Sequence, residues 1–120
     1  MSLTLSEKNK TEIVNVALSI CAKDGILSGT ELSTLREKFP EYFKVKIEEK
    51  DFEAMVDDFF QSDKHIEAYL EPITDQELRR SVLIISMESA ASDGLDIREN
   101  IAFDKAMMMW GFELKDLRHG

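Results

Sequence analysis

A helix end and a helix start lie close together in the segment AKDGILSGTE at residues 22–31. Asp24-Gly25 is typical of a helix C-terminus, because glycine just past the last turn adopts the left-handed conformation without a steric penalty. Ser28-Gly29-Thr30-Glu31 has the pattern of a capping box, in which a hydroxyl and a glutamate satisfy the first free N–H groups of a helix. The segment therefore predicts a tight helical hairpin.

The residues on either side of this segment have helical periodicity. A capping box at Thr4-Leu5-Ser6-Glu7 is expected to open the first helix, and Pro40 is expected to end the second, because a residue before proline disfavours helical geometry. Apolar residues recur at steps of three and four, which predicts an apolar stripe along one face of each helix. The stripe residues are Ile13, Val14, Ala17, Leu18, Ile20 and Cys21 in the first helix and Leu32, Leu35 and Phe39 in the second.

The same order of signals returns later in the chain, which indicates an internal repeat. The second copy has capping boxes at Thr74-Asp75-Gln76-Glu77 and Asp96-Ile97-Arg98-Glu99, with a stop at Asp93-Gly94 between them. Two copies of one helical hairpin pack most simply about a pseudo-twofold axis. We therefore expect the two Asp-Gly turns to lie in related positions.

The remaining apolar residues predict further helices and no strand. An amphipathic helix is indicated by Phe52, Met55, Val56, Phe59 and Phe60, and a short helix by Ile66, Tyr69 and Leu70. The core-facing candidates of a long helix are Leu78, Val82, Ile85 and Ser89. The last major helix carries Ile101, Ala102, Lys105, Met109 and Trp110, ends at Gly111 and is followed by a tail with Leu114 and Leu117. We predict an all-α, compact bundle of about six to seven helices built from two pseudo-symmetric hairpin repeats. A single domain would span residues 1–120, with repeat one at about 4–40, connecting helices at about 41–73 and repeat two at about 74–117.

Composition narrows the classes of partner. Apolar residues make up 43% of the 120-residue chain, which is enough for one core. The 24 acidic residues outnumber the 15 Lys and Arg residues, and a net charge of -9 disfavours binding to nucleic acid. Cys21 is the only cysteine, and no apolar run reaches the roughly 20 residues that span a bilayer. We expect a cytoplasmic protein that does not insert into membranes directly.

Residues 22–31 and the segment AASDGLDIRE at 90–99 resemble the signature of the tellurite-resistance TerB-like family. That signature is an alanine-rich helix end, an Asp-Gly pair, a capping residue and a glutamate. The stretch from Glu99 through Trp110-Gly111-Phe112 is similar to the ending of the family's second copy. The resemblance covers most of the chain outside roughly 40–73, and the second loop is one residue shorter than the first. It implies a helical, non-catalytic module with a metal-binding or scaffolding role in a bacterial stress response.

Five acidic residues are the candidate ligands of a divalent cation of the calcium or magnesium type: Asp24, Glu31, Asp93, Asp96 and Glu99. An aspartate at a helix C-terminus is unfavourable by about 0.3 to 1 kcal/mol, so it needs a compensating partner. A hard cation would supply one, and backbone N–H groups of the following turn would supply another. The two glutamates are equally explained as members of capping boxes. The second turn is the richer candidate, because Glu88 adds a further carboxylate. Metal binding and simple capping both remain open.

The methionines at 107–109 suggest a different kind of function. At about 100° per residue, Met107, Met108 and Met109 cannot all face one core, and methionine suits adaptable interfaces. The alternative function is therefore a metal-free protein–protein interaction module that uses the Met107 to Trp110 surface, with a protein partner or a second copy as ligand. Cys21 lies on an apolar stripe and has no nearby catalytic partner in sequence, so we do not expect an enzyme.

Overall fold

Seven α-helices make up the part of the chain that the computed structural model describes, which is residues 7–22, 29–43, 46–62, 64–91 and 100–117. No β-strand occurs within these ranges. The predicted all-α bundle of about six to seven helices is thereby confirmed. In chain order the helices are α1 (Glu7–Cys21), α2 (Gly29–Phe43), α3 (Glu49–Gln61), α4 (Ile66–Leu70), α5 (Gln76–Ala91), α6 (Ile101–Trp110) and α7 (Leu114–Leu117).

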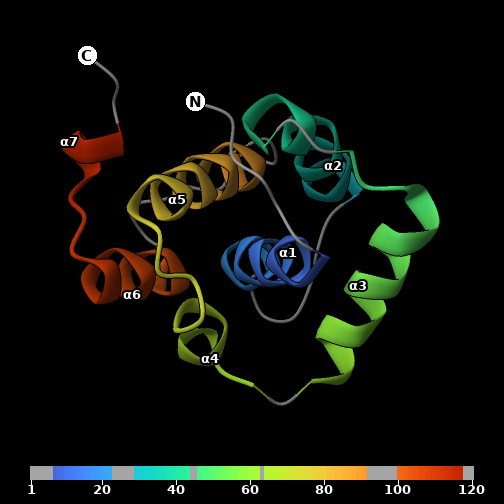
Figure 1. Cartoon of the computed structure of the whole chain (residues 1–120), viewed down its shortest axis with the longest axis horizontal. Coiled ribbons are helices and arrows are strands. Elements are labelled where there is room, and N and C mark those ends of the chain that lie inside the picture. The colour runs from blue at the N-terminus through green and yellow to red at the C-terminus, as the bar shows by residue number, and fades with distance from the viewer. Residues whose placement is uncertain (1–6, 23–28, 44–45, 63, 92–99, 118–120) are drawn as a thin grey trace.

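Two helices, α1 and α5, form the centre of the bundle. Helix α1 lies near the middle of Figure 1 and contacts α3, α4, α5 and α6. Burial extends beyond its predicted stripe, since Val16 is also fully buried. In α5 every residue from Val82 to Ser86 is buried, and the predicted core positions Leu78, Val82, Ile85 and Ser89 are among its buried residues. A helix that is apolar on most sides belongs inside a protein, and these two supply much of the core.

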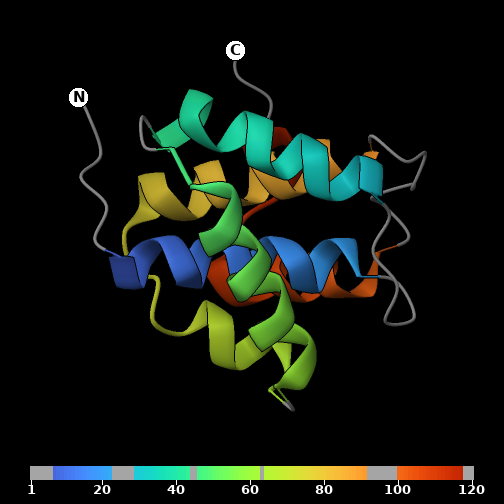
Figure 2. The same cartoon turned by 90° about the vertical axis from the view of Figure 1, so that its right-hand side faces the viewer.

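The other helices pack around this pair. Helix α2 lies on α5, α3 and α4 lie on α1, and α7 contacts α5. Helix α6 packs on α4 and α5 as well as on α1. In Figure 2, α1, α2, α5 and α6 run roughly alongside one another, and α3 crosses them. The hairpin repeats therefore share a core but do not make the same contacts, because α2 packs on α5, whereas α6 packs on α1, on α5 and on the connecting helix α4.

The end of α2 differs from the prediction. Pro40 does not end this helix, which continues to Phe43 with the proline inside it. Proline is unfavourable there because it lacks an N–H group and its ring crowds the carbonyl four residues earlier. The continued helix buries Phe43 completely and places its ring 4.7 Å from the ring of Phe39, centroid to centroid. Burial of such a side chain is worth about 1.5 to 3 kcal/mol, which is comparable to the cost of the proline.

Two helix starts also differ from the prediction. Asn100 is the cap of α6, with extended φ and ψ of -85° and 111°, and its side-chain oxygen accepts a hydrogen bond of 2.8 Å from the N–H of Phe103. The box at 96–99 therefore does not cap this helix, and Glu99 precedes the cap in the sequence. At α5 the shift is one residue: Asp75 Oδ1 accepts from the N–H of Leu78 at 2.9 Å, so Asp75 takes the capping role predicted for Thr74.

The buried face of α6 does not follow from the residues that indicate this helix in the sequence. Of these residues Trp110 is buried, whereas Ile101, Lys105 and Met109 are exposed. Apolar residues occupy most positions of this helix, so periodicity alone permits either face. The residues that are buried are Phe103, Ala106, Met107 and Trp110. The predicted end at Gly111 is confirmed, since this glycine has a left-handed φ of 73°.

Candidate functional site

Four of the five predicted cation ligands, Asp24, Asp93, Asp96 and Glu99, lie outside the described residues. The fifth, Glu31, is in the first turn of α2, and its side chain lies outside the described part of the structure. Within the residues that are described, no group of three or more His, Cys, Asp or Glu side chains could hold a metal ion. The cation site therefore stays a prediction.

The described residues that flank both Asp-Gly segments lie at one end of the bundle. In Figure 2 the C-terminal ends of α1 and α5 and the N-terminal ends of α2 and α6 all lie at the right. Asn100 Nδ2 donates a hydrogen bond of 2.6 Å to the carbonyl oxygen of Ile20, which is one of the last carbonyls of α1 and has no partner within the helix. Asn100 thus caps α6 and holds its start on the end of α1.

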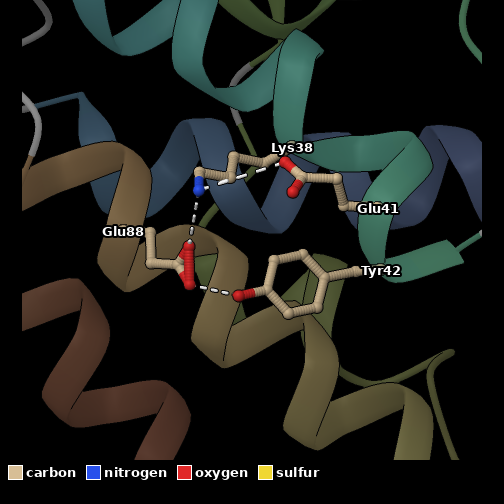
Figure 3. Close-up of polar contacts among 4 residues, drawn as sticks. All are labelled: Lys38, Glu41, Tyr42 and Glu88. Atoms are coloured by element: carbon tan, nitrogen blue, oxygen red, sulfur yellow. Dashed lines mark hydrogen bonds and ion pairs between the residues drawn. The ribbon is translucent and has the colours of Figure 1, made fainter.

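Glu88, which precedes the second acidic turn in the sequence, contacts two side chains of α2. Its carboxylate accepts a hydrogen bond from the phenol of Tyr42, and its second oxygen lies 3.5 Å from Lys38 Nζ. Figure 3 shows both α2 side chains pointing at this carboxylate on α5. Lys38 is also 4.0 Å from Glu41, one turn further along α2. These three groups, Lys38, Tyr42 and Glu88, form a polar clasp between α2 and α5.

The clasp changes the acidity of the tyrosine. The pKa of Tyr42 is raised well above its ordinary value, first because burial disfavours the charged phenolate and then because its proton is donated to the Glu88 carboxylate. The neutral phenol is therefore the form that the folded state stabilises. Tyr42 and Glu88 are 46 positions apart, so no local sequence pattern could have paired them.

The predicted division of the three methionines is confirmed. Met107 is buried, whereas Met108 is 76% exposed and Met109 is 46% exposed. Ile101, seven residues before Met108 and hence on the same side of the helix, is 78% exposed. We call this side the α6 outer face, and its residues are Ile101, Asp104, Lys105, Met108 and Met109.

The other half of the predicted Met107 to Trp110 surface belongs to the core. Trp110 is buried, its Nε1 donates a hydrogen bond of 3.3 Å to the carbonyl oxygen of Leu70, and the Arg79 guanidinium lies 5.4 Å from its ring centroid. Met107 is buried beside it. Any surface for a partner is therefore narrower than predicted and is shifted toward Ile101.

One ion pair crosses the edge of the α6 outer face. Lys105 Nζ lies 3.1 Å from a carboxylate oxygen of Glu67 on α4. The pKa of Glu67 is lowered, first by a hydrogen bond from its own backbone N–H and then by this lysine. The charge of Lys105 is thus balanced locally, whereas Asp104 has no ion-pair partner among the described residues.

Cys21 is buried at the end of α1, as its place on the predicted stripe implies. A buried thiol of this kind packs as a small apolar side chain. Among the described helices, none is long and apolar enough to cross a membrane.

Comparison of the chain with models of protein families, with curated proteins and with solved structures gives no match.

Proposed function

We propose that this chain is a non-catalytic protein-binding module that receives its partner on the α6 outer face. The observation that carries the proposal is the exposure of Ile101 and Met108, at 78% and 76%, on the side of α6 directly opposite its buried residues. Exposed apolar side chains on one side of a helix are typical of interaction sites, and methionine adapts its shape to a partner.

The partner that fits this surface best is a basic segment with an apolar face, presented as a helix. The chain carries a net charge of -9, and Asp104 lies within the face itself. Glu71, just after the neighbouring helix α4, adds an exposed carboxylate, while the carboxylate of Glu67 is already paired with Lys105. A positive rim on the partner would complement this potential, whereas a second copy of the chain would bring the same negative charge.

The α6 outer face is held in a fixed conformation, which favours binding. Asn100 anchors the start of α6 to α1, and the left-handed Gly111 closes its end, where it donates to the carbonyls of Met107 and Met108. On the buried side of α6, Trp110 contacts Leu70 of α4 and Arg79 of α5. A surface that is already ordered loses little conformational entropy when a partner binds.

The proposal is tested with a synthetic amphipathic helical peptide that has leucines on one face and lysines on the other. Binding is measured by calorimetry and mapped by amide NMR shifts on α6. We expect Ile101→Ser and Met108→Ser each to weaken binding about tenfold, because each removes apolar area from the contact. The free energy of unfolding should change by less than about 0.5 kcal/mol, since both side chains are exposed.

Phe60→Ser is the matched control, because Phe60 is also a large exposed apolar residue, at 47%, but lies on α3. It should leave binding unchanged. A version of the peptide with glutamates in place of lysines should bind far more weakly. Equal binding of both peptides would contradict the charge argument, and a dimer that Met108→Ser dissociates would assign the face to a second copy.

A second candidate function is the one that the TerB-like resemblance implies, a divalent-cation sensor or scaffold in a bacterial stress response. The hydrogen bond from Asn100 to Ile20 supports it, because this bond draws together the described residues that flank the two acidic segments. Asp24, Glu31, Asp93, Asp96 and Glu99 would supply oxygen ligands, which calcium and magnesium prefer.

This second candidate is tested by melting temperatures with and without calcium, magnesium, manganese or zinc. An ion at about 100 times its dissociation constant stabilises the folded state by roughly 2.7 kcal/mol, which raises the melting temperature by several degrees. Asp93→Asn should abolish the rise and should not affect binding of the basic peptide. An unchanged melting temperature with every ion would remove this candidate and leave the α6 proposal intact.

A further inference from the structure

A solvent-open hollow of about 320 Å³ lies between one side of α2 and the segment that leads into α3. Its position on α2 follows from helical spacing, because its four α2 residues occur at steps of three, one and three and so share one side. The two other residues come just before α3, and one of them, Ile47, is buried. The lining residues are Ser33, Arg36, Glu37, Pro40, Lys46 and Ile47.

The charge of this hollow is opposite to that of the whole chain. Two cations and one carboxylate line it, while the protein carries a net charge of -9. Among the described residues Lys38, Lys105 and Lys115 pair with carboxylates, whereas Lys50 and Lys64 on the open surface do not. Within the described residues neither Arg36 nor Lys46 has such an ion pair. Two cations without ion pairs at one concave site leave room for an anion from outside.

We propose that this hollow binds a small organic carboxylate that carries an apolar body. The planar guanidinium of Arg36 can donate two parallel N–H bonds to the two oxygens of a carboxylate, and Lys46 adds a second positive charge. Pro40 and Ile47 provide apolar walls for the rest of the ligand. Glu37 disfavours a multiply charged ligand such as a phosphate ester, because it adds a negative charge to the same hollow. The volume lies at the small end of ligand-binding pockets, which span about 300 to 1,000 Å³.

The test uses N-acetyl-leucine as the probe, with N-acetyl-leucinamide as an uncharged twin of the same shape. Titration followed by NMR should give saturable shifts confined to the hollow, with a dissociation constant in the millimolar range for the acid and much weaker binding of the amide. Arg36→Gln and Lys46→Gln should each weaken binding of the acid about tenfold, because each removes a charge-assisted hydrogen bond. Lys50→Gln, which alters an exposed lysine of α3 outside the hollow, should leave binding unchanged.

Two further measurements are needed. The first distinguishes a protein C-terminus from a free organic acid as the source of the carboxylate, and the second distinguishes this proposal from the one for the α6 outer face. A short peptide ending in leucine with a free C-terminus that binds more tightly than N-acetyl-leucine identifies a protein C-terminus as the ligand, and equal binding identifies a free organic acid. Met108→Ser on α6 should not change either result. Binding of the amide as tight as that of the acid, tighter binding of inorganic phosphate, or the absence of saturable shifts would each overturn the proposal.

Discussion

The polar clasp between α2 and α5 makes the stability of the protein depend on alkaline pH. Since the pKa of Tyr42 is raised in the folded state, its contribution to stability is fully present below the ordinary tyrosine pKa of about 10 and is lost as pH rises above it. We expect the free energy of unfolding to fall above pH 10, and to fall less steeply in Tyr42→Phe. Chemical denaturation across this pH range measures the difference between the two profiles.

Tyr69→Phe is the control, because it removes the other tyrosine of the chain, whose phenol donates to Ser62 Oγ, and keeps the clasp. Because the clasp is intact in this variant, the contribution of Tyr42 to the alkaline slope should remain. At neutral pH, Tyr42→Phe should cost about 1 kcal/mol for the lost hydrogen bond. Parallel profiles for the wild-type protein and Tyr42→Phe would show that the folded state does not raise the pKa of Tyr42 in solution.

Asn100 is the second residue on which the fold depends, because one side chain serves two helices. Asn100→Ala removes both the bond from Phe103 N–H and the bond to the Ile20 carbonyl, and should destabilise the protein by about 2 kcal/mol. Asn100→Asp keeps an oxygen for the cap but cannot donate to that carbonyl, so it should also lose stability, mostly through the α1 contact. Thermal denaturation of both variants checks this, and a neutral Asn100→Ala would remove the double role.

At the level of helices, the sequence predicts that a helix is present more accurately than it predicts the residues at which the helix begins and ends. Helix α6 shows why. Asp96 and Asn100 are both good capping residues, and the bond from Asn100 to Ile20, 80 positions away, favours Asn100 as the cap. The same limit applies to its buried face, because apolar residues on both sides make the periodicity ambiguous. The helix end at Gly111 could be predicted without tertiary information, since glycine adopts the left-handed backbone without a steric penalty.

Helix α2 offers a test of how tertiary burial overrides a local signal. Pro40→Ala restores the missing N–H group and removes the ring from a helix that continues to Phe43. It should therefore stabilise the protein by about 1 kcal/mol or more. Urea denaturation of this variant is the measurement, and Pro72→Ala, at a proline outside any helix, is the comparison. No gain in Pro40→Ala would mean that the helix is not continuous through residue 40 in solution.

At the scale of the whole molecule, the shared core follows from composition and periodicity, but the packing order does not. The repeat suggests equivalent halves, whereas α2 packs on α5 and α6 divides its contacts among α1, α4 and α5. Helices α3 and α4 both pack on α1 and break the equivalence, and their sequences hold no sign of where they dock. The clasp of Tyr42 with Glu88 escaped prediction for the same reason, because it is a consequence of packing.

The net charge of -9 gives stability and binding opposite responses to salt. Self-repulsion destabilises a compact acidic chain, and the screening length falls from about 30 Å at 0.01 M salt to about 8 Å at 0.15 M, so the melting temperature should rise over this interval. Binding of the lysine-bearing peptide to the α6 outer face should weaken over the same interval, because screening reduces attraction between opposite charges. Association of two copies would instead strengthen, since like charges repel less. Calorimetry and sedimentation at both salt concentrations separate the two partners, and peptide binding that tightens with salt would refute the assignment to a basic segment.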